Sequence, residues 1–203
     1  AIVLLALSLG GCAFGDRQAN LQYPPKQDSG TMVKSAEAAT MTPAAIASAP
    51  TIAILRFSDD RAEQNVVGHV RNGWGMKTAD VLSPTDVSAW VSDALKFELE
   101  KVGFRVKQVT GTGDAAAAEA DAAISGQVIR MYADAYFSYE GEVTLRAEIA
   151  KDGSKVMDRL YTGTAGGGLN MAATGASYAH TLSLALQDGL QEVVADIIRE
   201  VGK

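Results

Sequence analysis

Cys12 is the only cysteine among the 203 residues, and its position carries more chemical information than that of any other residue. It directly follows residues 1–11, an apolar run without a charged side chain. One thiol cannot form a disulfide within the chain or a metal site built from several cysteines. The chemistry open to it is attack on a substrate or covalent modification of its sulfur. The neighbouring residues distinguish the two.

Leu9, Gly10 and Gly11 lead into Cys12 in a pattern that resembles the bacterial lipobox, in which a leucine and two small residues precede a cysteine. The apolar run is shorter than the roughly 20 residues of a transmembrane helix, and it has the length and small-residue ending of a secretory signal. The resemblance implies cleavage between Gly11 and Cys12, a diacylglyceryl group on the sulfur and an acyl chain on the new amine. An acylated Cys12 cannot act as a nucleophile.

Such an anchor predicts where the protein resides. Several acyl chains hold a protein stably at a bilayer, whereas one chain gives marginal binding. In enterobacterial lipoproteins an aspartate after the cysteine favours the inner membrane, and here that position is Ala13. We therefore expect the periplasmic face of the outer membrane. We also expect the precursor to begin before Ala1, because such signals start with Met and a basic segment. The alternatives are an ordinary signal peptide and a buried apolar strand with a free thiol.

Composition divides the chain into three parts. The apolar fraction of 47% and the net charge of −6 are typical of a globular protein and argue against binding to nucleic acid. Residues 1–11 form the signal remnant. Residues 12–50 are rich in Ala, Ser, Gln, Thr and Pro without a sustained period, so we expect a flexible tether that begins at the lipidated cysteine. Residues 51–203 should form a globular periplasmic domain.

The pattern within residues 51–203 predicts an α+β fold. Apolar and alternating runs predict strands at 51–57, 66–70, 74–78, 104–109, 122–136, 141–150 and 156–162. Helical spacing predicts one helix from Ser83 to a stop at Gly103, and another from Thr174 or Ser177 to about residue 201. Glycine-rich residues 165–168 should end the last strand. The most economical packing has two layers, with both helices on one face of a mixed, mostly antiparallel sheet.

We find no constellation of residues for catalysis or metal binding. His69 and His180 lie far apart in the sequence and not at a metal-ligand spacing. The chain lacks a G-x-S-x-G elbow, and the glycines of residues 163–168 lack the Lys-Ser or Lys-Thr of a P-loop. The sequence therefore predicts no catalytic residue, no metal and no cofactor beyond the covalent lipid on Cys12.

Asp59, Asp60 and Arg61 are the first candidates for binding. They follow a predicted strand and combine two carboxylates with a guanidinium. This arrangement fits either a ligand site or a turn with a local ion pair.

Aromatic residues are the second candidates. Trp74 follows the hairpin signal Asn-Gly at 72–73, and Tyr132, Tyr136 and Tyr139 lie near another predicted hairpin end. Tyr and Trp are enriched at protein interfaces because they combine a large apolar area with a polar group. Strand alternation places Tyr132 and Tyr136 on one face, with Phe137 and Tyr139 on the other. Some of them must therefore pack in the core.

Several short segments resemble the YajG-type bacterial lipoproteins. They are the predicted helix at 91–99, Gly-Phe-Arg-Val at 103–106, Ala-Ile-Ser-Gly-Gln-Val at 123–128 and Tyr-Ala-Asp at 132–134. The order of strands and helices resembles, more distantly, the periplasmic domains of curli-secretion lipoproteins and penicillin-binding-protein activators. These resemblances imply an envelope lipoprotein that acts by contacting a partner and has no established catalytic residues.

We therefore expect a non-enzymatic, lipid-anchored accessory subunit that binds another envelope protein. The sequence specifies neither the partner nor the oligomeric state. The alternative is a protein that binds a small ligand or a glycan between residues 59–61 and residues 166–168. That alternative requires the two segments to lie at the same end of the sheet.

Overall fold

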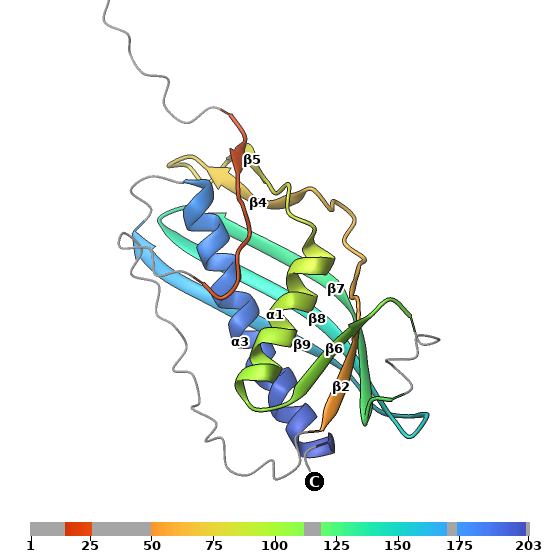
Figure 1. The fold of residues 1–203 in the computed structure, drawn as a ribbon. Helices are drawn as coiled ribbons and strands as arrows, with labels where there is room; N and C mark the ends of the chain where they lie inside the picture. The colour runs from red at the N-terminus through yellow and green to blue at the C-terminus, as the bar shows by residue number, and fades with distance from the viewer. Residues whose placement is uncertain (1–14, 26–49, 112–118, 170–173, 202–203) are drawn as a thin grey trace, which may run out of the picture.

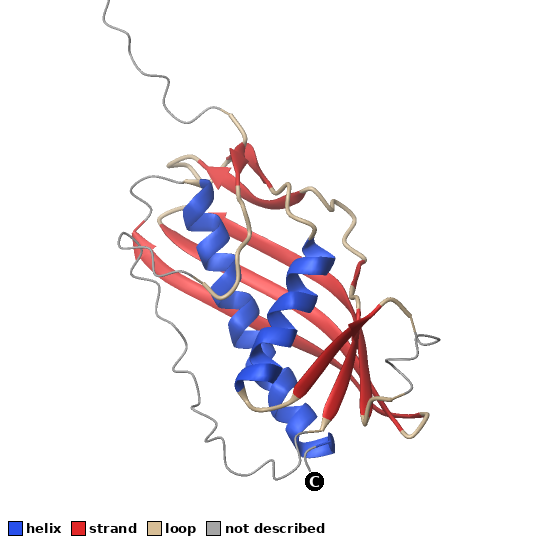
Figure 2. Cartoon of the chain, viewed as in Figure 1, coloured by secondary structure: helices blue, strands red, loops and turns tan. Residues whose placement is uncertain are grey.

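In the described part of the chain, a nine-stranded mixed sheet forms one layer and two helices form the other (Figures 1 and 2). The computed structural model describes residues 15–25, 50–111, 119–169 and 174–201. The strands are β1 (Arg17–Gln18), β2 (Thr51–Leu55), β3 (Ser58–Asp59), β4 (Val66–Arg71), β5 (Lys77–Leu82), β6 (Arg105–Val109), β7 (Ala122–Ala135), β8 (Ser138–Lys151) and β9 (Ser154–Leu169). The helices are α1 (Val87–Lys101) and α3 (Gly175–Val201).

Strand β7 lies at the centre of the sheet. On one side β8 pairs antiparallel with β7, and β9 pairs antiparallel with β8. On the other side β2, β3 and β4 follow one another along β7, and all three are parallel to it. β6 extends the sheet beside β2, while β5 and then β1 extend it beside β4. The long antiparallel ladders of β7, β8 and β9 confirm the predicted mixed, mostly antiparallel sheet.

Both helices cover the same face of this sheet (Figure 2). α3 packs on β7, β8 and β9, and α1 packs on β2, β6 and α3. The alternation predicted for β8 is confirmed, since one of its faces is buried beneath α3; its buried residues there are Val143, Leu145, Ala147 and Ile149. Apolar side chains recur about every 2 residues in the strands and every 3.6 residues in the helices, so each element has one apolar face, and these faces form one continuous core.

The start of α1 differs from the prediction. Asp86, not Ser83, is the N-cap, because its carboxylate accepts a hydrogen bond from the backbone N–H of Ala89 at 2.9 Å. Ser83 lies in the turn before the helix, where its hydroxyl oxygen accepts a hydrogen bond from the N–H of Thr85. The predicted stop is confirmed, since the helix ends at Lys101 and Gly103 adopts a φ of 102°, a conformation that favours glycine.

The glycine-rich stretch does not end the last strand as predicted, because β9 continues through it to Leu169. Gly163, two residues before this stretch, lies where α3 crosses the sheet. A Cβ on Gly163 would be 2.0 Å from the carbonyl oxygen of Ala185 and 2.2 Å from the backbone nitrogen of Gly189. Glycine is therefore required at Gly163 for close packing of a helix on a strand, and no turn forms there.

Residues 15–25, which we call the N-terminal strap, lie within the range predicted as a tether but pack on the domain. β1 pairs with β5, and the strap then runs between α3 and α1 (Figure 1). Ala19 and Leu21 are buried in the core, and Tyr23 packs edge-on against Phe97 of α1. The physical reason is that three apolar side chains at alternate positions fill the groove between the helices.

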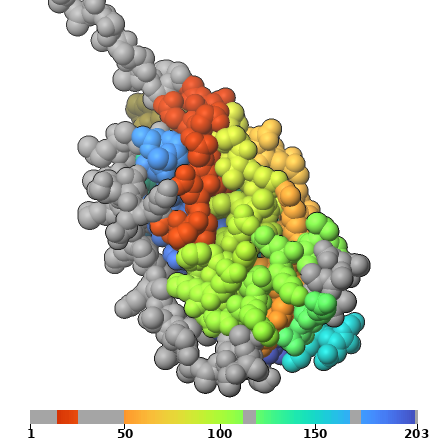
Figure 3. All heavy atoms as spheres, viewed as in Figure 1, coloured from red at the N-terminus to blue at the C-terminus, as the bar shows by residue number. Residues whose placement is uncertain are grey.

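Polar contacts fix the strap along its length. The N–H of Leu21 donates to the hydroxyl of Thr85, and the hydroxyl of Ser183 donates to the carbonyl of Gln22. Figure 3 shows the strap at the surface between the beginning of α3 and the segment that leads into α1. The described residues of the strap therefore pack as part of the folded domain.

Candidate functional site

The face of the sheet opposite the helices carries the polar side chains of β7 and β8. On β7, Met131 and Ala133 point into the core. Arg130 and Tyr132 alternate with them and therefore point to the other face. A register shift between Val128 and Arg130 lies just before this pair and adjusts the alternation. Two pockets open on this face, and both include Arg130 and Tyr132 in their walls.

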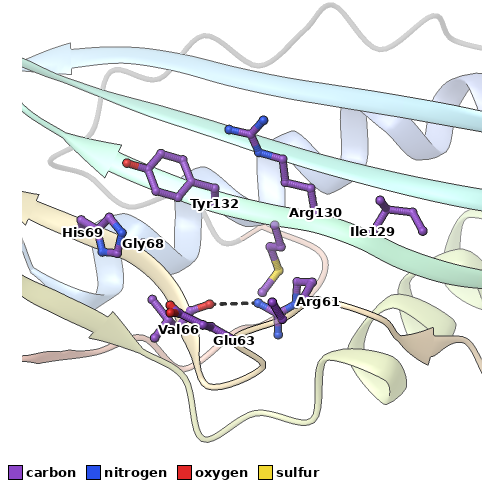
Figure 4. Close-up of a pocket in the computed structure, with 10 residues that line it drawn as sticks. Arg61, Glu63, Val66, Gly68, His69, Ile129, Arg130 and Tyr132 are labelled. Carbon is purple, nitrogen blue, oxygen red and sulfur yellow. Dashed lines mark hydrogen bonds between the residues drawn. The ribbon is translucent and has the colours of Figure 1, made fainter.

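The first pocket lies between β7, β4 and the loop after β3, and encloses about 290 Å³ (Figure 4). Arg61 lines this pocket. The guanidinium group of Arg61 donates to both carboxylate oxygens of Asp59 at 2.8 Å, and to the carbonyls of Gln64 and Val66 at 2.6 and 3.0 Å. Its side chain is only 5% exposed. The structure therefore supports the turn with an ion pair, because Arg61 uses its donors to hold the loop in shape.

His69 and Tyr132 form another wall of the first pocket. The Nδ1 atom of His69 is 2.8 Å from Oδ1 of Asp80, and its ring meets the ring of Tyr132 edge-on. The hydroxyl of Tyr132 donates to Asp134 at 2.6 Å and accepts from Arg71 at 3.2 Å. Burial and the neighbouring carboxylate raise the pKa of Tyr132. These contacts join β4, β5 and β7, so the wall of the pocket is a rigid polar network.

The second pocket lies between β7, β8 and the end of β9, and encloses about 420 Å³. Its walls include Glu140, Glu142, Thr164 and Gly166 besides Arg130 and Tyr132. The guanidinium group of Arg130 is 3.3 Å from Oε1 of Glu142 and 6.0 Å from the centre of the Tyr132 ring. Arg130 is thus an exposed cation between two pockets, held by one carboxylate and one aromatic face.

One residue from each segment of the predicted ligand site lines a pocket, but the two residues line different pockets. Arg61 lines the first pocket and Gly166 lines the second, while Arg130 and Tyr132 line both. Asp60 is exposed, and its backbone N–H donates to the carbonyl of Val128.

The predicted aromatic residues separate into different environments. Tyr139 is 2% exposed and packs edge-on against Tyr178 of α3, so it belongs to the core and not to a partner surface. Tyr132 belongs to the pocket walls. Trp74 and Tyr136 are exposed, together with Met76 and Phe137. We call the last four residues the aromatic tip.

Sequence reasoning missed Arg130, Glu142 and Met76, and it named Phe137 among the aromatic residues without choosing it as a candidate for binding. Nothing in the local sequence distinguishes Arg130 and Glu142 from other surface charges, since only strand pairing brings them together. A signal did exist for Phe137 and Met76, because large apolar side chains in hairpin turns are unusual where polar residues are the rule.

Within the described residues, no three His, Cys, Asp or Glu side chains are grouped to hold a metal ion. Neither described helix is apolar enough over the length needed to cross a bilayer.

Comparisons with known proteins find similarity to solved structures. No family model matches the sequence, and no curated protein matches it either. A Xanthomonas campestris protein of the DUF330 family is similar in structure, with a TM-score of 0.53 and 14% identity over 91% of this chain and 95% of that one. A PelC dodecamer from Paraburkholderia phytofirmans has a TM-score of 0.45 and 16% identity over 70% and 90% of the two chains.

The lipoprotein GNA1162 from Neisseria meningitidis is also similar, with a TM-score of 0.33 and 12% identity over 75% of this chain and 97% of that one. At these identities the similarity concerns the arrangement of strands and helices alone. Of these three proteins, the Xanthomonas protein alone has a TM-score above 0.5. The chain thus has the two-layer fold of that protein, and its function must be argued from its own residues.

Proposed function

We propose that this chain is a lipid-anchored protein of the bacterial envelope that acts without catalysis, by binding another envelope protein. The observation that carries the proposal is the short distance in sequence between the lipobox-like residues and the folded domain. Gly15, the first described residue, follows Cys12 by three residues. Three residues span at most about 11 Å when fully extended. The acylated cysteine would therefore hold the domain directly at the bilayer surface.

This geometry changes the expected mechanism of anchoring. A tether over residues 12–50 would let the domain sample a large volume above the membrane. With the strap packed on the domain, the anchor limits both the height and the orientation of the domain. Confinement near the membrane raises the effective concentration of the domain toward other membrane-bound proteins, so weak contacts become useful.

Metabolic labelling tests the anchor. The chain with a complete signal segment, expressed in a Gram-negative host with radioactive palmitate, should incorporate label and fractionate with membranes. The variant Cys12→Ala should incorporate no label and should either appear in the soluble periplasmic fraction or accumulate as an uncleaved precursor. A Cys12→Ala chain that is processed and still fully membrane-bound would contradict the anchor.

The outer face of the sheet supports the partner-binding role. Arg130 is exposed, and its ion pair with Glu142 lies at the surface, where such pairs contribute little stability. A carboxylate of a partner can replace Glu142 at little cost, and the two neighbouring pockets can receive its side chains. The walls of these pockets are fixed by the contacts of Arg61, His69 and Tyr132, so the surface is formed before binding.

A pull-down from detergent-solubilised membranes tests this surface. The proposal expects a protein that co-purifies with the parent chain but is lost with Arg130→Glu. Arg105→Glu is the matched control, because Arg105 is an exposed strand arginine on β6, away from both pockets. Equal recovery with both variants would exclude the Arg130 surface as the contact.

A small anionic ligand or a glycan is the second candidate, and one observation favours it. Arg61 and Gly166 line two neighbouring pockets, and both pockets include Arg130 and Tyr132 in their walls. Titration with chitobiose or with citrate, followed by amide chemical shifts, should move resonances of β7 near Arg130. Shifts distributed without relation to the pockets would contradict this candidate.

The proposal includes the periplasmic face of the outer membrane as the location, supported by Ala13 after the cysteine. It also includes kinship with the YajG-type lipoproteins, supported by the short segments at 91–99, 103–106, 123–128 and 132–134. Separation of inner and outer membranes on a sucrose gradient tests the location. The Ala13→Asp variant should move toward the inner-membrane fraction in an enterobacterial host.

A further inference from the structure

The aromatic tip is one continuous cluster built by two turns. Trp74 and Met76 come from the loop between β4 and β5, and Tyr136 and Phe137 come from the turn between β7 and β8. The hydroxyl of Tyr136 donates to the carbonyl of Gly73 at 2.9 Å and so joins the two turns. Its ring centre is 4.0 Å from that of Phe137. Four large apolar side chains therefore project from one end of the domain.

The loop between β4 and β5 does not need the side chains of Trp74 and Met76 to keep its shape. Asn72 holds the loop between β4 and β5, because its side-chain oxygen accepts hydrogen bonds from the N–H groups of Trp74 and Met76. The side chain of Trp74 contributes nothing to this backbone network and remains 86% exposed, while Phe137 is 67% exposed. Exposed apolar clusters of this kind mark surfaces that contact a partner or a membrane.

The direction of β1 points the beginning of the described chain toward the end of the sheet that carries the tip. β4 and β7 are parallel, so the loop after β4 and the turn after β7 lie at one end of the sheet. β1 is parallel to β5, with Arg17 beside Val81 and Gln18 beside Leu82. Traced backward from Arg17, the chain therefore runs along β5 toward the loop that carries Trp74. Figure 1 shows β1, β4 and β5 together at this end of the domain.

The position of Asp16 supports this direction, since its carboxylate accepts a hydrogen bond from the backbone N–H of Asp80 at 3.0 Å. Cys12 lies four residues before Asp16. At about 3.5 Å per residue, its acyl chains begin within roughly 14 Å of a point beside Asp80 on β5. Asp80 is itself four residues from Met76, a comparable length along an extended strand.

We infer that the aromatic tip inserts into the lipid–water interface of the bilayer that holds the acylated Cys12. This inference rests on the proposed anchor. Trp and Tyr favour the interface because their rings are apolar and their N–H or O–H groups remain hydrated. The cations that flank the loop have acidic partners, since Arg71 pairs with Asp134 and Lys77 with Asp80. Burial of the apolar surface of the tip therefore drives insertion, and insertion does not require electrostatic attraction between the acidic chain and anionic lipid.

Tryptophan emission tests the inference in the full lipidated protein. The chain has two tryptophans, and Trp90 is buried, so Trp90→Phe leaves Trp74 as the reporter. The protein is reconstituted into phosphatidylcholine vesicles with or without brominated acyl chains, which quench indoles at membrane depth. Acylation is measured on the same sample by mass spectrometry, and vesicle binding by flotation.

Two further probes provide a matched pair in the Trp74→Phe, Trp90→Phe background. Phe137→Trp places an indole on the tip, and Leu160→Trp places one on β9, where the original side chain is 65% exposed against 67% for Phe137. The inference expects Trp74 and the indole at position 137 to lose most of their emission in brominated vesicles. The indole at position 160 should keep its emission.

The outcomes separate the two proposals. An acylated, floating protein whose Trp74 is not quenched would overturn the inference and leave the anchor intact. A blue-shifted Trp74 that brominated lipid does not quench would also overturn it, because a second copy or another protein would then cover the tip. A chain without acyl groups that does not float would instead contradict the anchor itself.

Discussion

The hydroxyl of Tyr23 donates a hydrogen bond to Oε1 of Glu98 at 2.5 Å, across 75 positions of sequence. This contact joins the N-terminal strap to the buried face of α1, since Glu98 is only 7% exposed. Burial, together with the nearby carboxylate, raises the pKa of Tyr23 far above its usual value, so the hydroxyl remains a donor at every physiological pH. The strap is thus held by a polar contact inside an apolar groove.

Replacing Tyr23 by Phe should therefore destabilise the domain without displacing the strap. The ring keeps its edge-on contact with Phe97, but the buried carboxylate of Glu98 loses its closest donor. Leaving a buried charged acceptor partly unsatisfied costs about 1–3 kcal/mol. Urea denaturation followed by circular dichroism measures this loss. Tyr23→Ala should cost more, because the ring contact is lost as well.

The strap shows where sequence reasoning fails. Ala19, Leu21 and Tyr23 give only three apolar side chains at alternate positions, within a stretch whose composition is typical of a linker. The hydrogen-bond partners of the strap are Thr85 before α1, Glu98 on α1 and Ser183 on α3. They lie 64, 75 and 161 positions away, and no local pattern indicates such contacts. By contrast, β8 could be predicted because its residues alternate between a buried face and a more exposed face from Ser138 to Ala150.

In the candidate site too, features that depend on the local sequence could be predicted, and features that depend on distant contacts could not. The aromatic residues were visible by type, and the ion pair of Asp59 with Arg61 followed from their nearness in sequence. The burial of Tyr139 was not visible, because it depends on the position of Tyr178 in α3. The exposed position of Arg130 between two pockets depends on a register shift in β7, which no propensity predicts.

Gly163→Ala should destabilise the packing of α3 on the sheet. The added methyl group would lie 2.0 Å from the backbone oxygen of Ala185, and backbone atoms cannot turn aside as a flexible side chain can. Overpacking of this kind costs about 1–3 kcal/mol. Gly166→Ala is the matched control in the same strand, because its nearest neighbour would be the oxygen of Tyr139 at an ordinary 3.7 Å. Thermal unfolding should show a lower Tm for the first variant alone, and equal Tm values would refute the close crossing.

Asp86 should contribute to the acid sensitivity of the fold. The backbone N–H of Ala89 and the guanidinium group of Arg56 lower the pKa of Asp86 below its usual 3.8. A carboxyl group whose pKa falls on folding stabilises the protein above the usual value, and this stability is lost as the pH falls through the lowered pKa. Stability measured by urea midpoint should therefore decline below about pH 4, and the decline should be shallower in Asp86→Asn.

Two variants distinguish the stability that Asp86 contributes as an N-cap from the stability that its charge contributes. Asn accepts the same N-cap hydrogen bond, so Asp86→Asn should lose little stability near pH 3. Asp86→Ala removes the cap at every pH and should cost about 1 kcal/mol at pH 7, and less near pH 3, where the parent chain has already lost part of the contribution of the Asp86 charge. If Asp86→Ala matched the parent chain at pH 7, the cap would contribute nothing and this account of the start of α1 would be wrong.

Arg61→Ala should act on stability, not only on binding at the outer face. The guanidinium group holds Asp59 and two backbone carbonyls in a nearly buried loop. Its removal leaves the carboxylate of Asp59, 12% exposed, without its cation, and breaking such a buried pair typically costs about 3–5 kcal/mol. Urea denaturation should show this loss, whereas Arg130→Ala should change stability by less than about 1 kcal/mol because its ion pair lies at the surface. If Arg130→Ala lost more stability than Arg61→Ala, Arg61 would be available for a ligand and Arg130 would be the structural residue. The two arginines border the same pocket, so this comparison decides which of them the outer face can offer to a partner.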